Sequence, residues 1–196
     1  MEFDFLVPLD SEILTYIKEL SAQHLGSKIV LHTNDSFPDL DKINIAIIGV
    51  LDNRGDKNAK VITDLNTFRK QLYGMFPGNW KASIADLGDI LAGNSKEDTY
   101  FALKKITSSL IRRKIVPIVI GGSQDITYAL YRSYDDLEQM VNLVSVDSKF
   151  DFGKDNEDIS ADSFLTKIII DEPNNLFNFC NIGYQTYYNS HEEIDL

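Results

Sequence analysis

Two glycines followed by polar residues come directly after a β-branched run, in a pattern typical of a turn that approaches a ligand. The run covers residues 115–120, and the residues that follow it are Gly121, Gly122, Ser123, Gln124 and Asp125. Paired glycines let the backbone turn sharply and approach another group closely. The segment is not a P-loop, because no Gly-Lys-Ser/Thr follows, and it lacks the third glycine of a dinucleotide-binding fingerprint. Spacing alone favours a tight turn that leads into a helix capped by Ser123.

Two aspartates follow a second β-branched run. Asp147 and Asp151 are four residues apart, directly after the run at residues 141–146, and Lys149 lies midway between them. Two carboxylates at this spacing could share one hard cation. The order does not match an EF-hand loop, which needs acids or amides at alternate positions before its glycine. The competing interpretation is a solvated acidic loop, and spacing alone favours the loop.

Alternating strands and helices must position these residues. Apolar β-branched runs predict strands over residues 28–32, 43–50, 82–87, 115–120, 141–146 and 176–182, with Gly88-Asp89 closing the third. Apolar residues at helical spacing predict helices over 61–75, 124–132 and 163–170, one after Asp10 or Ser11, and one from Ser95 to Arg112-Arg113. This alternation indicates βαβ units and a parallel sheet. Ligands bind such sheets at the carboxyl ends of strands, where both motifs lie.

Composition excludes several classes of protein. The chain has 196 residues, 43% of them hydrophobic and 25% charged, which is ordinary for a globular domain. Its 30 acidic and 19 basic residues give a net charge of −11, which disfavours binding to nucleic acid or to an anionic membrane surface. The N-terminus lacks the pattern of a signal peptide, so we expect a soluble cytoplasmic protein. The single cysteine, Cys180, falls in a strand expected to be buried and is interpreted as a small core residue.

Taken together, the two motifs resemble the ureohydrolase family of arginase, agmatinase and formimidoylglutamase. Residues 117–127 resemble the family's P-[IV]-[VI]-[LI]-G-G-D-H-S-[IL]-[TS], and residues 144–151 resemble its strand followed by D-A-H-x-D. Weaker counterparts occur in the same order at residues 45–50, at Arg69 with Leu72-Tyr73, at 86–89 and at 181–183. The motifs are specific as a pair and weak singly. The resemblance is clearest over residues 43–183, and the formimidoylglutamase branch is the nearest.

The resemblance implies a fold, a reaction and a metal centre. It implies a three-layer α/β/α domain with a mainly parallel sheet over residues 1–196, and hydrolysis of a linear amidine or guanidine C–N bond. The family uses two Mn²⁺ ions bridged by hydroxide, which lower the pKa of water and hold it against the carbon. Asp147 and Asp151 match two of the family's metal ligands.

Four departures from the family pattern put the metal centre in doubt. Gln124 and Lys149 replace the two motif histidines, and Ser123 replaces an aspartate. A neutral amide is a poor Mn²⁺ ligand, and an ammonium repels a dication by several kcal/mol, even at an effective dielectric constant of about 20. The family's third ligand motif, S-x-D-x-D, does not occur. We therefore expect no cofactor, and Mn²⁺ only if the family activity is retained.

Lys149 offers a different way to satisfy the two aspartates. An ammonium between Asp147 and Asp151 would neutralise them without metal, since buried carboxylates need a cation of some kind. Removing it would then cost about 3–5 kcal/mol, as for other broken buried pairs.

The last residues form a capping box, Ser190 with Glu193, three residues before Leu196. A single turn of helix is not stable alone, so we expect a chain truncated at its C-terminus and prone to oligomerise.

Three functions remain open. The first is a non-catalytic family member that has lost the Mn centre, and the second is an active hydrolase of amidine or guanidine C–N bonds. The third is a scaffold or regulatory subunit that binds a partner protein, a second copy or a small cationic ligand. The expected pocket residues are Gly121, Gly122, Ser123, Gln124, Asp125 and Lys149.

Overall fold

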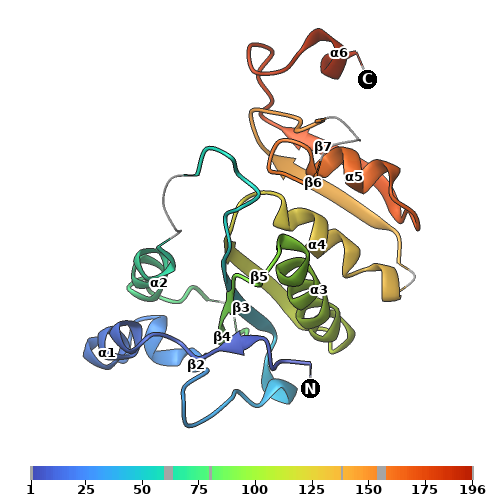
Figure 1. The fold of residues 1–196 in the computed structure, drawn as a ribbon. Coiled ribbons are helices and arrows are strands. Elements are labelled where there is room, and N and C mark those ends of the chain that lie inside the picture. The colour runs from blue at the N-terminus through green and yellow to red at the C-terminus, as the bar shows by residue number, and fades with distance from the viewer. Residues whose placement is uncertain (1, 60–63, 80, 138, 154–157, 196) are drawn as a thin grey trace. The chain divides into compact units, whose positions relative to one another are not determined.

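The structure is a computed structural model that describes residues 2–59, 64–79, 81–137, 139–153 and 158–195 (Figure 1). The chain divides into two compact units. The N-terminal unit comprises residues 1–53 and 59–122, and the C-terminal unit comprises residues 54–58 and 123–196.

The N-terminal unit is built on a five-stranded sheet. Its strands are β1 (Leu6–Val7), β2 (Val30–Leu31), β3 (Ile45–Leu51), β4 (Ile84–Leu91) and β5 (Val116–Gly121). The order is β1-β4-β3-β5, and β2 also pairs with β4. The pairs β2–β4, β3–β4 and β3–β5 are parallel, and only the short β1 runs antiparallel. The central strand β3 is almost entirely buried, as its β-branched composition predicts.

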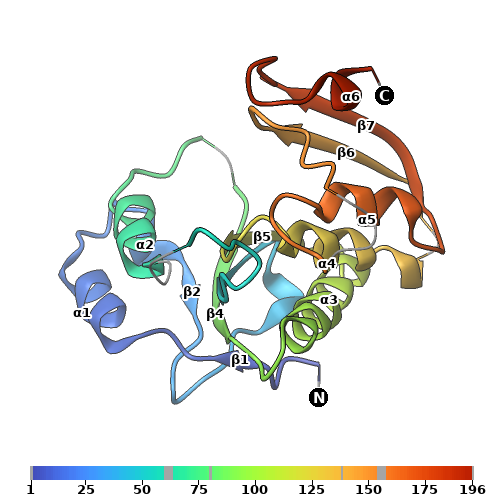
Figure 2. The same ribbon diagram turned by 45° about the horizontal axis from the view of Figure 1, so that its top comes forward.

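Helices cover both faces of this sheet. Figures 1 and 2 show α1 (Ser11–Glu19) and α2 (Leu65–Tyr73) on one face and α3 (Lys96–Arg112) on the other. Two short 3₁₀ helices cover Gly26–Lys28 and Leu40–Lys42. Asp10 caps α1, Asp64 caps α2, and Ser95 with Asp98 forms a capping box at α3. The core between the sheet and the first two helices includes Ile13, Leu25, Ile29, Ile47, Tyr73 and Ile84.

Among its described residues, the C-terminal unit has two parallel strands and three α-helices. The strands are β6 (Val141–Val146) and β7 (Leu176–Ile182), and the helices are α4 (Ile126–Arg132), α5 (Phe164–Ile170) and α6 (His191–Ile194). A 3₁₀ turn covers Asp135–Leu137. Tyr131 from α4 and Phe164, Leu165 and Ile168 from α5 form the core against one face of the strands. Residues along β6 accordingly alternate between partly buried and exposed.

The predicted α/β fold with mainly parallel pairing is confirmed, and three local predictions are corrected. The strand that was expected to close at Gly88-Asp89 continues to Leu91. Cys180 is exposed, because it lies on the face of β7 opposite the core that α4 and α5 form. The helix expected over 61–75 is observed from Leu65 to Tyr73, and residues 61–63 lie outside the described residues.

Gly88 explains why β4 continues through a glycine. The residue has a φ of +84°, and the register of β3 against β4 shifts beside it, between Ile47 and Gly49. A Cβ atom at Gly88 would lie 2.0 Å from the carbonyl oxygen of Val7 in β1. Gly88 is therefore a bulge residue that lets β1 approach closely, and it does not end the strand.

Candidate functional site

The two glycines of the first motif have the backbone conformation that glycine favours. Gly121 ends β5 with a φ of +83°, and Gly122 follows it with a φ of +73°. Both belong to the N-terminal unit, whereas Ser123, Gln124, Asp125 and the whole second motif belong to the C-terminal unit. The expected tight turn is confirmed.

The role expected for Ser123 is different from the one observed. The helix α4 begins at Ile126, after Asp125, and Ser123 Oγ donates a hydrogen bond to the Asp125 carboxylate. Ser123 is therefore not the helix cap that the spacing predicted. Its hydroxyl instead holds a carboxylate of its own turn.

Gln124 and Asp147 form the direct contact between the two motifs. Gln124 Nε2 donates to Asp147 Oδ2 at 2.6 Å, and the backbone N–H of Lys149 donates to Asp147 Oδ1 at 3.0 Å. Partial burial of Asp147 opposes its negative charge, but these hydrogen bonds outweigh it and lower the pKa of the carboxyl. N–H donors thus hold both oxygens of a carboxylate that matches a family metal ligand.

Asp151 lies in a less favourable environment. It is only 7% exposed and adopts a left-handed backbone conformation with a φ of +58°. Burial, followed by the negative charges of Asp147 and Asp162, raises its pKa to about 7, although Lys149 acts in the opposite direction. Asp151 is the strongly perturbed carboxyl of the second motif.

The ammonium of Lys149 pairs with a different carboxylate from those expected. Lys149 Nζ lies 3.3 Å from Asp162 Oδ1, and both side chains are about half exposed. The prediction that Lys149 bridges Asp147 and Asp151 is therefore wrong, because its ammonium pairs with Asp162. A half-exposed pair costs little to form, because neither charge has to leave water completely.

The donor chemistry of these residues bears on whether they could hold a metal ion. Within the ranges that the structure describes, no group of three or more His, Cys, Asp or Glu side chains could hold a metal ion. Gln124 presents an N–H donor where a ligand atom would be needed, and Lys149 adds a positive charge. The histidines do not compensate. Of the three, His24 contacts Ser21 and Phe76, His32 contacts the carbonyl of Leu87, and His191 is exposed at the start of α6.

Sequence reasoning missed a buried cluster of charges in the N-terminal unit. Arg69 Nε lies 2.8 Å from Asp86 Oδ2, and Arg69 Nη2 lies 2.7 Å from Asp89 Oδ1. Tyr73, one turn along α2 from Arg69, donates its hydroxyl proton to Asp86. Burial disfavours the charged guanidinium, but the two carboxylates outweigh it and raise the pKa of Arg69. The available signal was the (i, i+4) spacing of Arg69 and Tyr73 on a helix that faces a strand with two aspartates.

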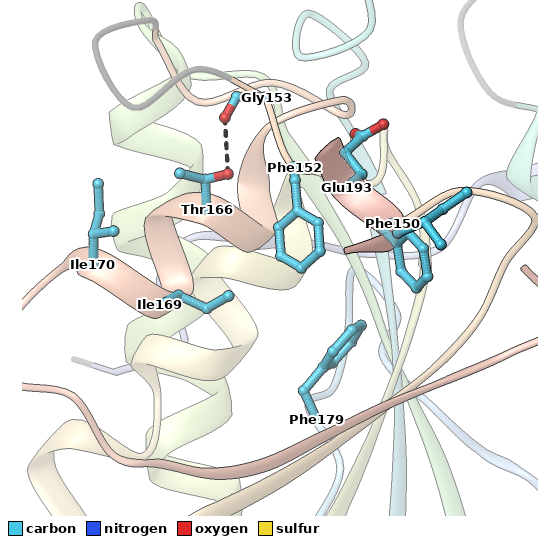
Figure 3. Close-up of a pocket in the computed structure, with 9 residues that line it drawn as sticks. Phe150, Phe152, Gly153, Thr166, Ile169, Ile170, Phe179 and Glu193 are labelled. Atoms are coloured by element: carbon cyan, nitrogen blue, oxygen red, sulfur yellow. Dashed lines mark hydrogen bonds between the residues drawn. The ribbon is translucent and has the colours of Figure 1, made fainter. Parts of the chain in front are cut away.

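Sequence reasoning also missed an apolar cavity of about 720 Å³ in the C-terminal unit (Figure 3). Its walls come from the loop after β6, from α5, from β7 and from the last residues, and they are Phe150, Phe152, Gly153, Thr166, Ile169, Ile170, Phe179, Glu193 and Ile194. Glu193 is the one ionisable residue among these. The signal in the sequence was the aromatic pair at residues 150 and 152, which flanks Asp151.

Comparisons with solved structures show a shared fold. Formiminoglutamase from Trypanosoma cruzi, solved with two Mn²⁺ ions, superposes with a TM-score of 0.69 at 17% identity, over 82% of this chain and 59% of that one. Formimidoylglutamase from Bacillus subtilis gives 0.65 at 15% identity, over 94% and 62%. A quadruple mutant of an arginase-like protein from Trypanosoma brucei gives 0.57 at 16% identity, over 94% and 60%. The chain thus spans about three fifths of the length of these proteins.

Searches with the sequence, and the character of the helices, add to the structural comparison. No curated protein sequence matches this chain. None of the helices in the described ranges has the length and apolar character needed to cross a membrane. The model of the arginase family matches residues 57–196, which include both strand-end motifs. The chain therefore belongs to the arginase family.

Proposed function

We propose that this chain is a non-catalytic member of the arginase family that has lost the dinuclear manganese centre. The observation that carries the proposal is the hydrogen bond from Gln124 Nε2 to Asp147 Oδ2, at 2.6 Å. A metal ion at Asp147 would have to displace this donor. It would gain no ligand atom from the donating end of the amide.

Charge adds to this loss of ligands. Lys149 lies between the two aspartates in the sequence, and its ammonium contributes to the electrostatic environment of Asp151. A dication at these carboxylates would be repelled by that positive charge. Metal sites of this type need deprotonated, electron-donating side chains, and Gln124 and Lys149 supply none.

One of the similar structures offers a parallel. The arginase-like protein from Trypanosoma brucei was solved with three serines replaced by aspartate and one arginine by histidine. Three of those four positions lie two residues apart, with the arginine in the middle. The spacing equals that of Asp147, Lys149 and Asp151 here. A basic residue midway in this triplet therefore also occurs in another chain with an arginase-like fold.

The test is calorimetry with MnCl₂ on the 196-residue chain at neutral pH. We expect no site tighter than about micromolar, and the matched variant Ser123→Asp/Gln124→His/Lys149→His should bind Mn²⁺ more tightly. Adding Asp147→Asn and Asp151→Asn to that variant should remove the gain. Two sites tighter than micromolar in the unaltered chain would refute the proposal and favour a hydrolase of linear amidine or guanidine C–N bonds.

A further inference from the structure

We propose that the apolar cavity of the C-terminal unit binds a small quaternary ammonium ion with an apolar substituent. The ammonium group would lie against the aromatic wall, which is formed by Phe150, Phe152 and Phe179 (Figure 3). The proposal does not depend on whether the chain binds manganese.

The aromatic wall is a set of phenylalanine rings that pack against one another beside the cavity. The rings of Phe150 and Phe152 stack with centroids 5.8 Å apart, and those of Phe152 and Phe179 meet edge to face at 6.5 Å. Phe150 also stacks on Tyr184, at 4.9 Å, which fixes its orientation. Ring faces attract a cation within about 6 Å of their centroids. Because these rings pack against one another, a cation would lie in the cavity against the ring surfaces that line it, and not between the stacked rings.

The surrounding charge favours a cation over a neutral or anionic ligand. Residues 139–153 and 158–195 contain nine carboxylates and two lysines. Glu193 lies at the rim of the cavity beside Phe150 (Figure 3). Lys149, one of the two lysines, pairs with Asp162. The local field is therefore negative, and it raises the local concentration of cations.

Hydrogen-bonding capacity distinguishes a quaternary ammonium from a primary one. Thr166 Oγ1 donates to the Gly153 carbonyl at 2.8 Å, and Glu193 Oε2 accepts from the Ser190 N–H at 2.7 Å. The cavity lining is otherwise apolar, so it offers few acceptors for the three N–H groups of a primary ammonium. Burying those donors unpaired is costly. A quaternary ammonium has no such donors and is recognised by ring faces and charge alone.

The size and the remaining walls define the rest of the ligand. A cavity of about 720 Å³ lies within the range of small-molecule sites. Ile169 and Ile170 of α5 are 41% and 47% exposed, so a ligand could cover apolar surface that the protein leaves in water. An aryl or branched alkyl substituent on the ammonium fits these aliphatic walls.

The experiment titrates the full 196-residue chain by calorimetry with benzyltrimethylammonium, benzylammonium and benzyl alcohol. We expect saturable binding of the quaternary ion. The other two compounds should bind about threefold to tenfold more weakly. Equal affinity for benzyl alcohol would overturn the proposal, because the cavity would then be merely apolar. Equal or tighter binding of benzylammonium would overturn the quaternary class. An absence of any heat up to about 10 mM would overturn the site.

Variants locate the binding. Glu193→Gln keeps a side chain that can cap α6 while removing the rim charge, and should weaken binding severalfold. Glu192→Gln is the matched control, because Glu192 is exposed and does not line the cavity, and it should change nothing. Phe179→Leu removes one ring of the wall and should weaken binding. Ile169→Arg, at an exposed helix position, should abolish binding by placing a cation at the site, and it keeps the test valid if Phe179→Leu fails to fold. Unchanged affinity in Ile169→Arg would show that the ion binds elsewhere.

Discussion

Asp151 is a buried carboxyl whose charge the fold disfavours. Its pKa is about 7 in the folded chain against an ordinary value of 3.8, with burial as the main cause. For an acid with a raised pKa, the folded state holds the proton more tightly than the unfolded state. The stability from that proton is complete below about pH 4 and is lost as the pH rises through about 7.

We therefore predict that Asp151→Asn stabilises the chain at high pH. Asparagine stays neutral, so at pH 8 the variant should exceed the unaltered chain by about 1–4 kcal/mol in free energy of unfolding. Below pH 4 the advantage should vanish. Urea denaturation at pH 4, 6 and 8 measures this, with the exposed substitution Glu192→Gln as control. A constant difference between Asp151→Asn and the unaltered chain across that range would contradict the prediction.

Removing the Lys149 side chain should lower the free energy of unfolding by less than the sequence predicted. Because its ammonium pairs with Asp162 and both side chains are about half exposed, Lys149→Ala should lower the free energy of unfolding by less than about 1 kcal/mol. Asp162→Asn should cost equally little, and the double variant no more. Chemical denaturation of the three variants is the measurement. A loss of about 3–5 kcal/mol in Lys149→Ala would support the bridge between Asp147 and Asp151 after all.

At the scale of elements, the buried pair of Arg69 with Asp86 and Asp89 joins α2 to β4. The guanidinium and the Asp86 carboxylate are 1% and 0% exposed, so removing one partner leaves an uncompensated buried charge. We predict that Arg69→Ala lowers the free energy of unfolding by about 3–5 kcal/mol.

The neighbouring residue provides the control for that prediction. Lys70 pairs with Glu12 at a much more exposed position, so Lys70→Ala should cost less than about 1 kcal/mol. Both variants shorten a long basic side chain on the same helix. Thermal or urea unfolding at pH 7 distinguishes them, and equal losses would mean that the buried pair adds nothing beyond an exposed one.

The elements that the sequence predicted well are those with a strong local signal. The β-branched run of β3 and the Ser95 capping box depend on neighbouring residues alone, and both were located to within a residue or two. Gly88 was misread because its role depends on β1, a two-residue strand far away in the sequence. Cys180 was misread because the exposure of β7 depends on which face α4 and α5 cover.

The candidate site follows the same rule. The turn at Gly121 and Gly122 could be predicted, because a pair of glycines indicates a backbone conformation that other residues rarely adopt. The partner of Lys149 could not be predicted, because a long side chain can reach several carboxylates and the choice is made by the folded loop. The cavity was missed for a similar reason. Phe150 and Phe152 lie in the loop after β6 and Phe179 lies in β7, and sequence spacing does not show that they meet.

At the scale of the whole molecule, each unit taken by itself has described strands that pair on one side only. Among the described residues, β5 pairs with β3 on one side only, and β6 and β7 pair only with each other. These strands also expose apolar side chains. Val116 and Ile118 are 58% and 43% exposed in β5, and Val144 and Val146 are 58% and 81% exposed in β6. Open edges with apolar side chains are templates for pairing with another chain.

We therefore predict that the 196-residue chain associates reversibly and more strongly as its concentration rises. The charge of −11 opposes association through repulsion, but it leaves the unpaired N–H and C=O groups of the edges available. Light scattering at low ionic strength should give a mass above the 22.2 kDa of one chain, and added salt should increase it by screening the repulsion. Ile118→Lys and Val146→Lys should each lower the average mass, because lysine on an edge strand disfavours pairing. Phe68→Lys, at a 44% exposed position on α2, removes a similar apolar side chain away from any edge and should leave the mass unchanged. If the chain stays at 22.2 kDa over the whole concentration range, or if Phe68→Lys acts as strongly as the edge variants, the open edges are not what drives association.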